Sequence, residues 1–574
     1  MFRSQLTARL LTAFEKAGIS LPEGTRPTVV LAADTRYGDY QSNTCMGLAK
    51  QLKTNPRALA QQVADALDVS DLCAKVSIDG PGFLNFTLGD AALSAHVLTA
   101  RRTDQLGVPT ATPRTIVVDF SAPNIAKPMH VGHIRSTIIG DCLARVARFL
   151  GHHVITDNHI GDWGTQFGMI LHGWKTLLDE AALEKDPIAE LLRLYKTVNA
   201  AAKADEAVMT TCREELVQLQ QGDAENLAIW RRCVDLSLDQ LRVIYAKLGV
   251  RFDHYLGESS YNDALAPLVE NLLASHIAEI SEGAVCIFFR DDPTLADKPC
   301  LIRKSDGGFL YATTDLATID HRINVWHATD IWYVVGSPQE LHFKQIFAAS
   351  HKRGQTASFQ HVAFGSILGP DGKMFRTRSG ESVGLIEVLD EAIERAAAVV
   401  AEREGLSDEE KATIGETIGI GAVKYAELSQ NRLTDYKFSW DKMLSLQGNT
   451  APYLINAYVR TRAIFRKLEG TPEGAGEIEA PAQLVFTEPA ERALAMKLAQ
   501  YAEAVHDVLD DFRPNLLANY LYELATTYHA FYEACPVLSS QGDIRATRLI
   551  LCDLTSQVLK SGLGLLGIQT TERM

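Results

Sequence analysis

Two histidines in the segment His-Val-Gly-His are the first feature of this sequence that suggests chemistry. His130 and His133 follow a polar loop (121–129) that carries two prolines, and a helix is expected to begin at about His133. A helix N-terminus offers free backbone N–H groups and the positive end of a dipole to an anion. Gly132 leaves room for a flat base to approach the backbone. We therefore predict a nucleotide site; the alternative is that both histidines are ordinary residues at a helix start.

A second candidate segment lies about 240 residues later, where glycines bracket three cations. Residues 369–380 contain Lys373, Arg376 and Arg378 between Gly369 and Gly380. A loop of this kind can close over a triphosphate and stabilise the charge that develops on pyrophosphate. By itself, the same pattern also fits a solvated surface loop.

An α/β pattern is expected to position these segments. Ile116–Val118 predicts a buried strand, a helix is predicted to run from about His133 to Leu150, and another strand begins at Val154. Strand, loop, helix and strand begin a doubly wound sheet, which binds ligands at the carboxyl ends of its strands. Residues 175–275 predict a helical insertion. Strand patterns then return at 285–290, 301–302, 309–310 and 331–335.

The flanking regions have different patterns. Residues 1–110 predict an α+β unit, with a hairpin formed by 75–78 and 83–88. After about residue 385 the pattern is helical, apart from a polar linker at 469–479. Gly562, Gly564 and Gly567 match the spacing GxGxxG, but no strand precedes them, so we interpret them as glycines that cap or pack a helix rather than as a dinucleotide site.

Composition excludes several classes of protein. The 574 residues carry 56 Lys and Arg against 71 Asp and Glu, a net charge of −15, which excludes a globally basic wrapper of nucleic acid but not a local basic groove. Nine cysteines without a CxxC pair predict buried free thiols, no disulfide framework and no structural zinc. No apolar run approaches the roughly 18–20 residues that span a bilayer. We predict a cytoplasmic protein with no membrane partner.

The two candidate segments together resemble the paired HIGH and KMSKS signatures of class I aminoacyl-tRNA synthetases. HVGH is a close variant of the first, and KMFRT is a looser form of the second, with Lys373 and Arg376 in its two cationic places. Within class I, the wider context resembles the arginyl-tRNA synthetase family. The matching stretches run in order along the chain: RYGDYQSN (36–43), GPGFLNF (80–86), SAPNIAKPMHVGHIRSTIIGD (121–141), HIGDWGTQFGM (159–169), FLYATTDLA (309–317), GNTAPYL (448–454) and LGIQTTERM (566–574).

The resemblance implies a multidomain α/β fold and a two-step reaction. ATP and L-arginine would give arginyl-adenylate and pyrophosphate, and the arginyl group would pass to the 3′-terminal adenosine of tRNA-Arg. Mg²⁺ would accompany ATP, with no metal site built by the protein, and a monomer is expected. Four parts are implied: 1–110, an additional domain that contacts the tRNA elbow; 111–385, a Rossmann-like catalytic domain with its helical insertion; 386–450, a helical stem-contact region; and 451–574, an all-α anticodon-binding bundle.

The resemblance also assigns roles to individual residues. The catalytic residues would be His130, His133, Lys373 and Arg376, and ATP would contact Lys127, His130, Gly132, His133, Lys373 and Met374. Arginine would contact Asp119, Ser121, Asn124, Tyr311, Asp315 and Gln339, and tRNA would contact Phe83, Asn85, Tyr453, Arg460 and Met574. The arginine pocket also has chemical logic, because carboxylates best meet the donors of a guanidinium, and Tyr311 and Asp315 are four apart and share a helix face.

Alternatives remain open at this point. Asp315 also fits an acid on a helix surface, and the tyrosines of 451–574 also fit packing within a bundle. Another class I synthetase or a related nucleotidyltransferase would keep HVGH and KMFRT without the arginine pocket. A catalytically silent RNA-binding protein on the same fold would be expected to lose a histidine or Lys373, and all three are present.

Overall fold

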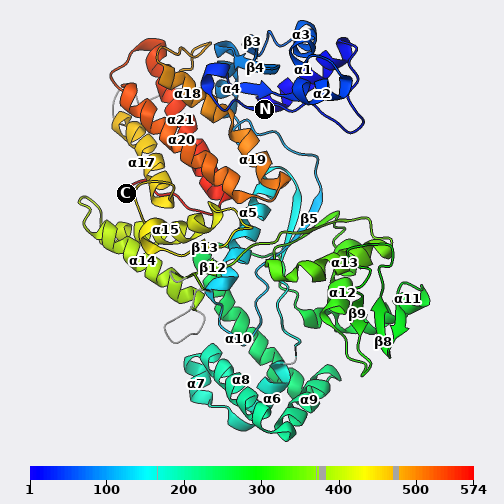
Figure 1. The fold of residues 1–574 in the computed structure, drawn as a ribbon. Coiled ribbons are helices and arrows are strands. Elements are labelled where there is room, and N and C mark those ends of the chain that lie inside the picture. Colours follow the sequence, from blue (N-terminus) through cyan, green and yellow to red (C-terminus); the bar gives the residue numbers. More distant parts are fainter. Residues whose placement is uncertain (165, 370–371, 374–382, 470–477) are drawn as a thin grey trace. The chain divides into compact units, whose positions relative to one another are not determined.

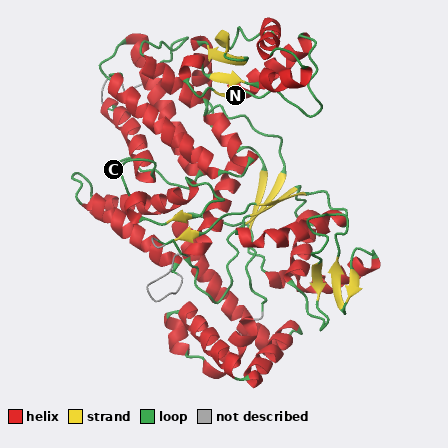
Figure 2. Cartoon of the chain, viewed as in Figure 1, coloured by secondary structure: helices red, strands yellow, loops and turns green. Residues whose placement is uncertain are grey.

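The computed structural model describes residues 1–574 except 165, 370–371, 374–382 and 470–477 (Figure 1). The chain divides into two compact units. Residues 1–110, 445–565 and 569–574 form one, called here the terminal unit; residues 111–444 and 566–568 form the other, called the central unit. Helices predominate in both (Figure 2). In the described part of the chain, no helix is long and apolar enough to cross a membrane.

The central unit is built on a four-stranded sheet. Its strands are β5 (Thr115–Asp119), β6 (His153–Asp157), β10 (Asp330–Tyr333) and β11 (Ser358–His361), in the order β11-β10-β5-β6. All three neighbouring pairs are parallel, which confirms the predicted doubly wound core. In this register Asp119 lies beside both Asp157 and Tyr333. Three polar strand ends therefore meet at the carboxyl edge of the sheet.

The helix after β5 forms as predicted. A single 3-10 turn, η2 (Val131–His133), leads into α5 (Ile134–Phe149). Gly140 lets α5 pack closely on the end of the strand, because a Cβ at Gly140 would lie 2.2 Å from the ring of Phe120. This close contact positions α5, and with it the histidine segment at its start, relative to the end of β5.

The predicted insertion is helical and has its own core. Aspartates at positions 179, 186, 205 and 223 cap the starts of α7 (Glu180–Lys185), α8 (Pro187–Ala204), α9 (Glu206–Gln220) and α10 (Ala224–Leu248) by accepting backbone N–H groups. Together with α6 (Gln166–Leu177), these helices bury a cluster that includes Phe167, Leu191 and Leu194. Then follow η3 (Glu258–Tyr261), α11 (Asn262–Ala274) and an antiparallel sheet of β7 (Glu279–Ser281), β8 (Ala284–Ile287) and β9 (Cys300–Arg303).

One predicted strand, 309–310, is wrong. Phe309 makes a single bridge to Arg303, and Leu310 is the N-cap of α12 (Tyr311–Asn324). The helical spacing of Ala312, Leu316 and Ile319 buries one face of α12 and overrides the short apolar pair. The remaining elements of this unit are η4 (Ser337–Gln339), α13 (Glu340–Lys352), β12 (Ile367–Leu368), α14 (Leu385–Ala401), α15 (Asp408–Leu428), β13 (Tyr436–Lys437) and α16 (Trp440–Met443).

The terminal unit joins the two ends of the chain. Its sheet runs in the order β1 (Val30–Leu31), β2 (Tyr40–Ser42), β4 (Phe83–Leu88) and β3 (Cys73–Asp79), and the predicted β3–β4 hairpin is confirmed. The hydroxyl of Tyr40 donates to Glu503, and Arg492 binds Asp39. The helices are α1 (Phe2–Lys16), α2 (Thr44–Leu52), α3 (Pro56–Ala66), α4 (Asp90–Arg101), α17 (Ala451–Leu468), α18 (Pro489–Ala499), α19 (Tyr501–Asp510), α20 (Pro514–Ala534) and α21 (Gly542–Leu565), with the short turn η1 (Thr35–Tyr37).

Two further predictions can be compared with the structure. Gly562 and Gly564 lie inside α21, and a Cβ at Gly562 would lie 2.5 Å from Leu521, so Gly562 serves helix packing as predicted. Nothing lies within 4 Å of a Cβ at Gly564, and Gly567 follows the end of the helix with a φ of 69°. All nine cysteines are free; Cys73 is half-buried and the other eight are buried.

Candidate active site

The loop after β5 has an unusual backbone. Ser121, Ala122 and Ala126 have φ angles of 72°, 43° and 58°, in the left-handed region that L-residues seldom adopt. Hydrogen bonds hold the loop, since the N–H of Ser121 donates to Ser136 Oγ at 2.8 Å and that of Ala122 to Asn158 Oδ1 at 3.1 Å. Such strained conformations persist where the surroundings fix them, and they cluster at functional sites.

The two predicted catalytic histidines lie next to each other just before α5. Their ring centroids are 4.0 Å apart and their ring planes are tilted by 42°. Nδ1 of His130 accepts from the N–H of Gly132, and Nδ1 of His133 accepts from the N–H of His130, both at 3.1 Å. A Cβ at Gly132 would lie 2.8 Å from the His130 ring, so here the space above the glycine backbone is filled by imidazole.

Both imidazoles are neutral near pH 7. Burial lowers the pKa of His130, and burial together with the His130 charge lowers the pKa of His133 to about 4. Nδ1 of His133 also lies 3.3 Å from the carbonyl oxygen of His130. In the tautomer in which each Nδ1 accepts a backbone hydrogen, the proton of each neutral ring resides on Nε2. The site therefore presents two uncharged Nε2–H donors, which suit phosphate oxygens.

The structure describes Gly369, Gly372 and Lys373 of the second predicted segment and the chain again from Val383. The N–H of Gly369 donates to the carbonyl of Lys373 at 2.7 Å, and this turn leaves Lys373 exposed. Beyond the segment, Val131 N–H donates to Val383 O and Leu385 N–H to Met129 O, both at 2.9 Å. The chain that follows the segment is thus paired with the histidine loop. Met374 and Arg376 lie outside the described residues.

Residues predicted to bind arginine gather around α12 and α13. Tyr311 and Asp315 lie one turn apart on α12 as predicted, and Tyr311 is 69% exposed. His342 on α13 contacts Asp315, with Nε2 and Oδ2 2.6 Å apart. Gln339 is exposed at the start of α13. His342 was not predicted, because a single histidine on a helix gives no pattern in the sequence.

A second carboxylate interacts electrostatically with Asp315. Glu258, at the start of η3, is half-buried, and burial together with the charges of Asp162 and Asp315 raises its pKa, while His159 opposes this. The segment carrying Glu258 is bound to the sheet edge, since Glu258 N–H donates to Ile160 O. Two neighbouring carboxylates suit a guanidinium. Glu258 was also missed, because it lies far from the motifs and resembles a surface acid.

Asp119 is buried at the end of β5 and already has a cationic partner. Its Oδ2 accepts from Nη2 of Arg322 at 2.6 Å, and the same nitrogen donates to Asp157 Oδ2 at 2.8 Å. Burial raises the pKa of Asp119 and the charge of Arg322 opposes the rise. Neither Arg322 nor Asp157 was predicted.

The other predicted residues near this loop have protein partners as well. The Ser121 hydroxyl is 2.8 Å from both Thr137 Oγ1 and Tyr245 Oη, inside the protein. Asn124 is exposed, and its backbone pairs with Gly161. The Lys127 ammonium lies 4.7 Å from the centroid of the Tyr195 ring on α8. The roles of these residues in substrate binding stay predictions.

The residues predicted to contact tRNA lie in the terminal unit. Asn85 is buried and spans the sheet, with its amide donating to Asp79 and accepting from Gln41, whereas Phe83 is half-buried. Tyr453 and Arg460 on α17 lie against α20. There Tyr453 packs with Tyr522 and His529, Arg460 contacts His529 at 3.1 Å and its guanidinium lies 5.6 Å from the Tyr532 ring centroid, while Met574 is half-buried.

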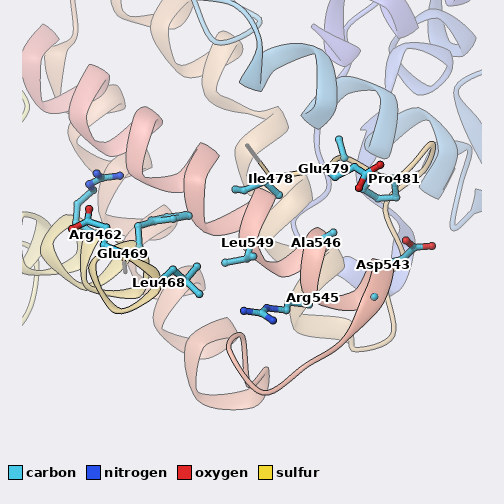
Figure 3. A pocket seen from close by; sticks show the side chains of 13 residues that line it. Arg462, Leu468, Glu469, Ile478, Glu479, Pro481, Asp543, Arg545, Ala546 and Leu549 are labelled. Atoms are coloured by element: carbon cyan, nitrogen blue, oxygen red, sulfur yellow. The ribbon is translucent and has the colours of Figure 1, made fainter. Parts of the chain in front are cut away.

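A pocket of about 680 Å³ also opens in this unit, between α17, α21 and residues 478–481 (Figure 3). Arg462, Glu469, Asp543 and Arg545 give it mixed charge, and none of its described lining residues is among those predicted to contact tRNA. Among the described residues, no three His, Cys, Asp or Glu side chains gather as metal ligands would.

Three domains of known protein families match this chain. Residues 96–440 match the family described as tRNA synthetases class I (R), catalytic domain; residues 454–574 match the DALR anticodon binding domain; and residues 4–88 match the arginyl tRNA synthetase N terminal domain. An arginine–tRNA ligase of Chromobacterium violaceum is 44% identical over 557 residues, 96% of each chain. One of Thermobifida fusca is 45% identical over 561 residues, again 96% of each.

Solved structures agree. The arginyl-tRNA synthetase of Plasmodium falciparum superposes with a TM-score of 0.86 at 27% identity, covering 100% of this chain and 99% of that one. The Thermus thermophilus arginyl-tRNA synthetase gives a TM-score of 0.84 at 26% identity, covering all of both chains. Catalytic, anticodon-binding and N-terminal domains are thus all matched in order, and the chain belongs to the arginyl-tRNA synthetase family of class I aminoacyl-tRNA synthetases.

Proposed function

We propose that this chain attaches L-arginine to tRNA-Arg through the site at the carboxyl edge of the parallel sheet. The observation that carries the proposal is the combination of two groups at one edge. The carboxylates of Glu258 and Asp315 interact electrostatically, and the segment of Glu258 is hydrogen-bonded next to the end of β6. The paired histidines follow the adjacent strand, β5.

In the first step, the arginine carboxylate attacks the α-phosphorus of ATP and pyrophosphate leaves. Glu258 and Asp315 bind the substrate guanidinium, with Tyr311 and Gln339 beside them. Asp119, close to the histidine loop, meets the α-ammonium group, with Ser121 and Asn124 nearby. His130 and His133 donate from Nε2 to phosphate oxygens, and Lys127 and Gly132 contact ATP. Lys373 and Arg376, with Met374, stabilise the leaving pyrophosphate. Mg²⁺ enters with ATP, held by phosphate oxygens and water.

In the second step, the arginyl group passes to the 3′-terminal adenosine of tRNA-Arg. Tyr453, Arg460 and Met574 in 451–574 contact the anticodon region, because aromatic and guanidinium groups stack on unpaired bases. Phe83 in residues 1–110 contacts the tRNA elbow, with the buried Asn85 holding the strand that carries it, and residues 386–450 contact the stem. The protein acts as a monomer in the cytoplasm, where its nine free thiols would stay reduced.

Arginine-dependent exchange between ATP and pyrophosphate tests the first step. The assay is run with a panel of amino acids, with and without total tRNA, and exchange is expected with arginine when tRNA is added. Exchange with a different amino acid would retain the fold and refute the pocket. A folded protein that shows no exchange under any condition would favour a silent RNA-binding role instead.

A further inference from the structure

Arg322 connects three strand ends of the central sheet. It lies on α12, seven residues and two helical turns after Asp315, and it is fully buried. Its Nη2 donates to Asp119 at the end of β5 and to Asp157 at the end of β6. Its guanidinium carbon lies 5.3 Å from the ring centroid of Tyr333, the last residue of β10.

The charges around this arginine do not balance. Two buried carboxylates face one guanidinium, so the group carries a formal charge of about −1 in a region from which water is largely excluded. Oδ1 of Asp157 accepts the N–H of Leu256 at 3.4 Å. In the described part of the chain, the contacts of Asp119 use Oδ2, and its side chain is 6% exposed. Oδ1 of Asp119 is therefore the oxygen left for a further cationic group.

We propose that Arg322 is a positioning residue for substrate arginine: it fixes one oxygen of Asp119 and keeps that carboxylate charged, so that the other oxygen receives the α-ammonium group of the substrate. This inference rests on the proposed function, because it takes Asp119 as a contact of the amino acid. Arg322 itself does not touch the substrate.

A second consequence concerns the direction in which arginine binds. The substrate has a cationic group at each end, and unoccupied carboxylates at both ends of the pocket would accept it in either direction. A resident guanidinium already occupies the Asp119–Asp157 pair. This pair then admits a small ammonium group but not a second planar guanidinium, and the arginine carboxylate is directed towards the histidine loop.

The contact geometry suggests the variants that test this role. Both ion pairs pass through one nitrogen, Nη2, so Arg322→Lys retains a single cationic nitrogen that can serve the same carboxylates. Arg322→Met removes the charge at similar length. The matched control is Arg353→Met, because the Arg353 side chain is also largely buried and is paired with an aspartate, Asp320, outside this cluster.

The experiment measures arginine-dependent ATP–pyrophosphate exchange, with tRNA present, from pH 6 to 8.5. Arg322→Met is expected to raise the KM for arginine at least about tenfold while kcat and the KM for ATP change less than threefold. In this variant the KM for arginine should fall as pH rises, because Asp119 without its cation is protonated at lower pH and regains its charge at higher pH. Asp119 is also faced by other titrating groups that remain unchanged in the variant: Asp157, His159, Tyr261 and Tyr333.

Two further measurements separate positioning from folding. Arg322→Lys should restore the KM for arginine to within about threefold of the unmodified protein. Arg322→Met combined with Asp119→Asn should be no worse than Asp119→Asn alone, because both act through the same carboxylate. If Arg322→Met does not fold, the KM of Asp119→Asn decides instead: a KM for arginine that Asp119→Asn does not raise refutes the inference.

Other outcomes also overturn it. An unchanged KM for arginine in folded Arg322→Met, or losses in kcat and KM that add in the double variant and that lysine does not rescue, would leave Arg322 a structural residue. Failure of the unmodified protein to activate arginine would refute the proposed function, which is a separate result.

Discussion

The two ends of the proposed site handle charge in opposite ways. At the arginine end the acids lie on or beside regular elements and have resident partners: Asp315 contacts His342, and Asp119 binds Arg322. At the nucleotide end the paired imidazoles are neutral and hydrogen-bonded to backbone, while the cation Lys373 is exposed on a turn.

This difference follows from what each end has to recognise. A guanidinium is a fixed cation with planar donors, so preorganised carboxylates select it and a neutral analogue leaves them unpaired. A triphosphate changes its charge distribution as pyrophosphate leaves, and neutral donors can follow that change without holding the product as tightly as fixed cations would. Variants at the two ends should therefore affect different kinetic constants.

The largest effect is expected at the arginine end. Asp315→Asn keeps the shape of the side chain and removes its charge, so kcat/KM for arginine should fall about 100- to 1,000-fold, since charge-assisted hydrogen bonds are worth about 1.5–3 kcal/mol each. The KM for ATP should change little. Asp320→Asn, on the same helix and paired with Arg353, is the control. A large rise in the KM for ATP alone would contradict the division between the two ends.

A smaller loss, confined to kcat, is expected at the nucleotide end. His133→Asn removes an Nε2–H donor and should lower kcat for exchange about 100-fold, the usual cost of one donor to developing charge. The KM for arginine should stay within about threefold. His153→Asn, an exposed histidine on β6, serves as the control. Equal losses in kcat and arginine affinity would show that the two ends are not separate.

Gly132→Ala should have a still smaller effect of the same kind. The added Cβ would lie 2.8 Å from Cε1 of His130, so the ring has to shift by a few tenths of an ångström. We expect kcat to fall about tenfold, as misplaced donors lose part of their effect. Gly47→Ala on α2, where a Cβ meets nothing within 4 Å, should be silent. Full activity of Gly132→Ala would show that the position of His130 is not critical.

The smallest effect on activity concerns pH. Because the pKa of His133 is lowered to about 4, the ring should stay neutral between pH 6 and 8, so its titration should not change the exchange rate in this range.

The free energy of unfolding, in contrast, should depend on pH. The unfolded chain, with an ordinary histidine pKa near 6.5, binds a proton that the folded protein does not, so stability falls as pH drops from about 6.5 to 4. In denaturant titrations, His133→Gln should reduce this fall by about 3 kcal/mol; an identical pH dependence would refute the burial of a neutral ring.

The elements of the site were more predictable than its charge partners. The strand at 115–119 and the helix at 134–149 follow from a β-branched run and a helical stripe, which act locally. Arg322 binds residues that are far away in the sequence, and Glu258 interacts with Asp315, which is also distant. In the sequence, a single charged residue of this kind cannot be distinguished from a charged residue on the protein surface. A signal for Arg322 did exist, because it falls two turns after Asp315 on the face that also buries Ile319. The strand expected at 309–310 was wrong for the converse reason: the helical period that follows it is stronger.

The composition of the terminal unit has a consequence for synthesis on the ribosome. Residues 1–110 share their unit with 445–565, and their polar contacts there include Tyr40 with Glu503 and Arg101 with Asp553. A ribosome adds about 5–20 residues per second, so the 335 residues from 110 to 445 delay the start of the partner segment by roughly 15–70 s. During that time α4 lacks α18 and α21, the later helices of its own unit that pack against it and help to bury Leu93 and Val97. The nascent chain thus exposes an apolar surface of the kind that chaperones bind, and slower translation would extend that exposure.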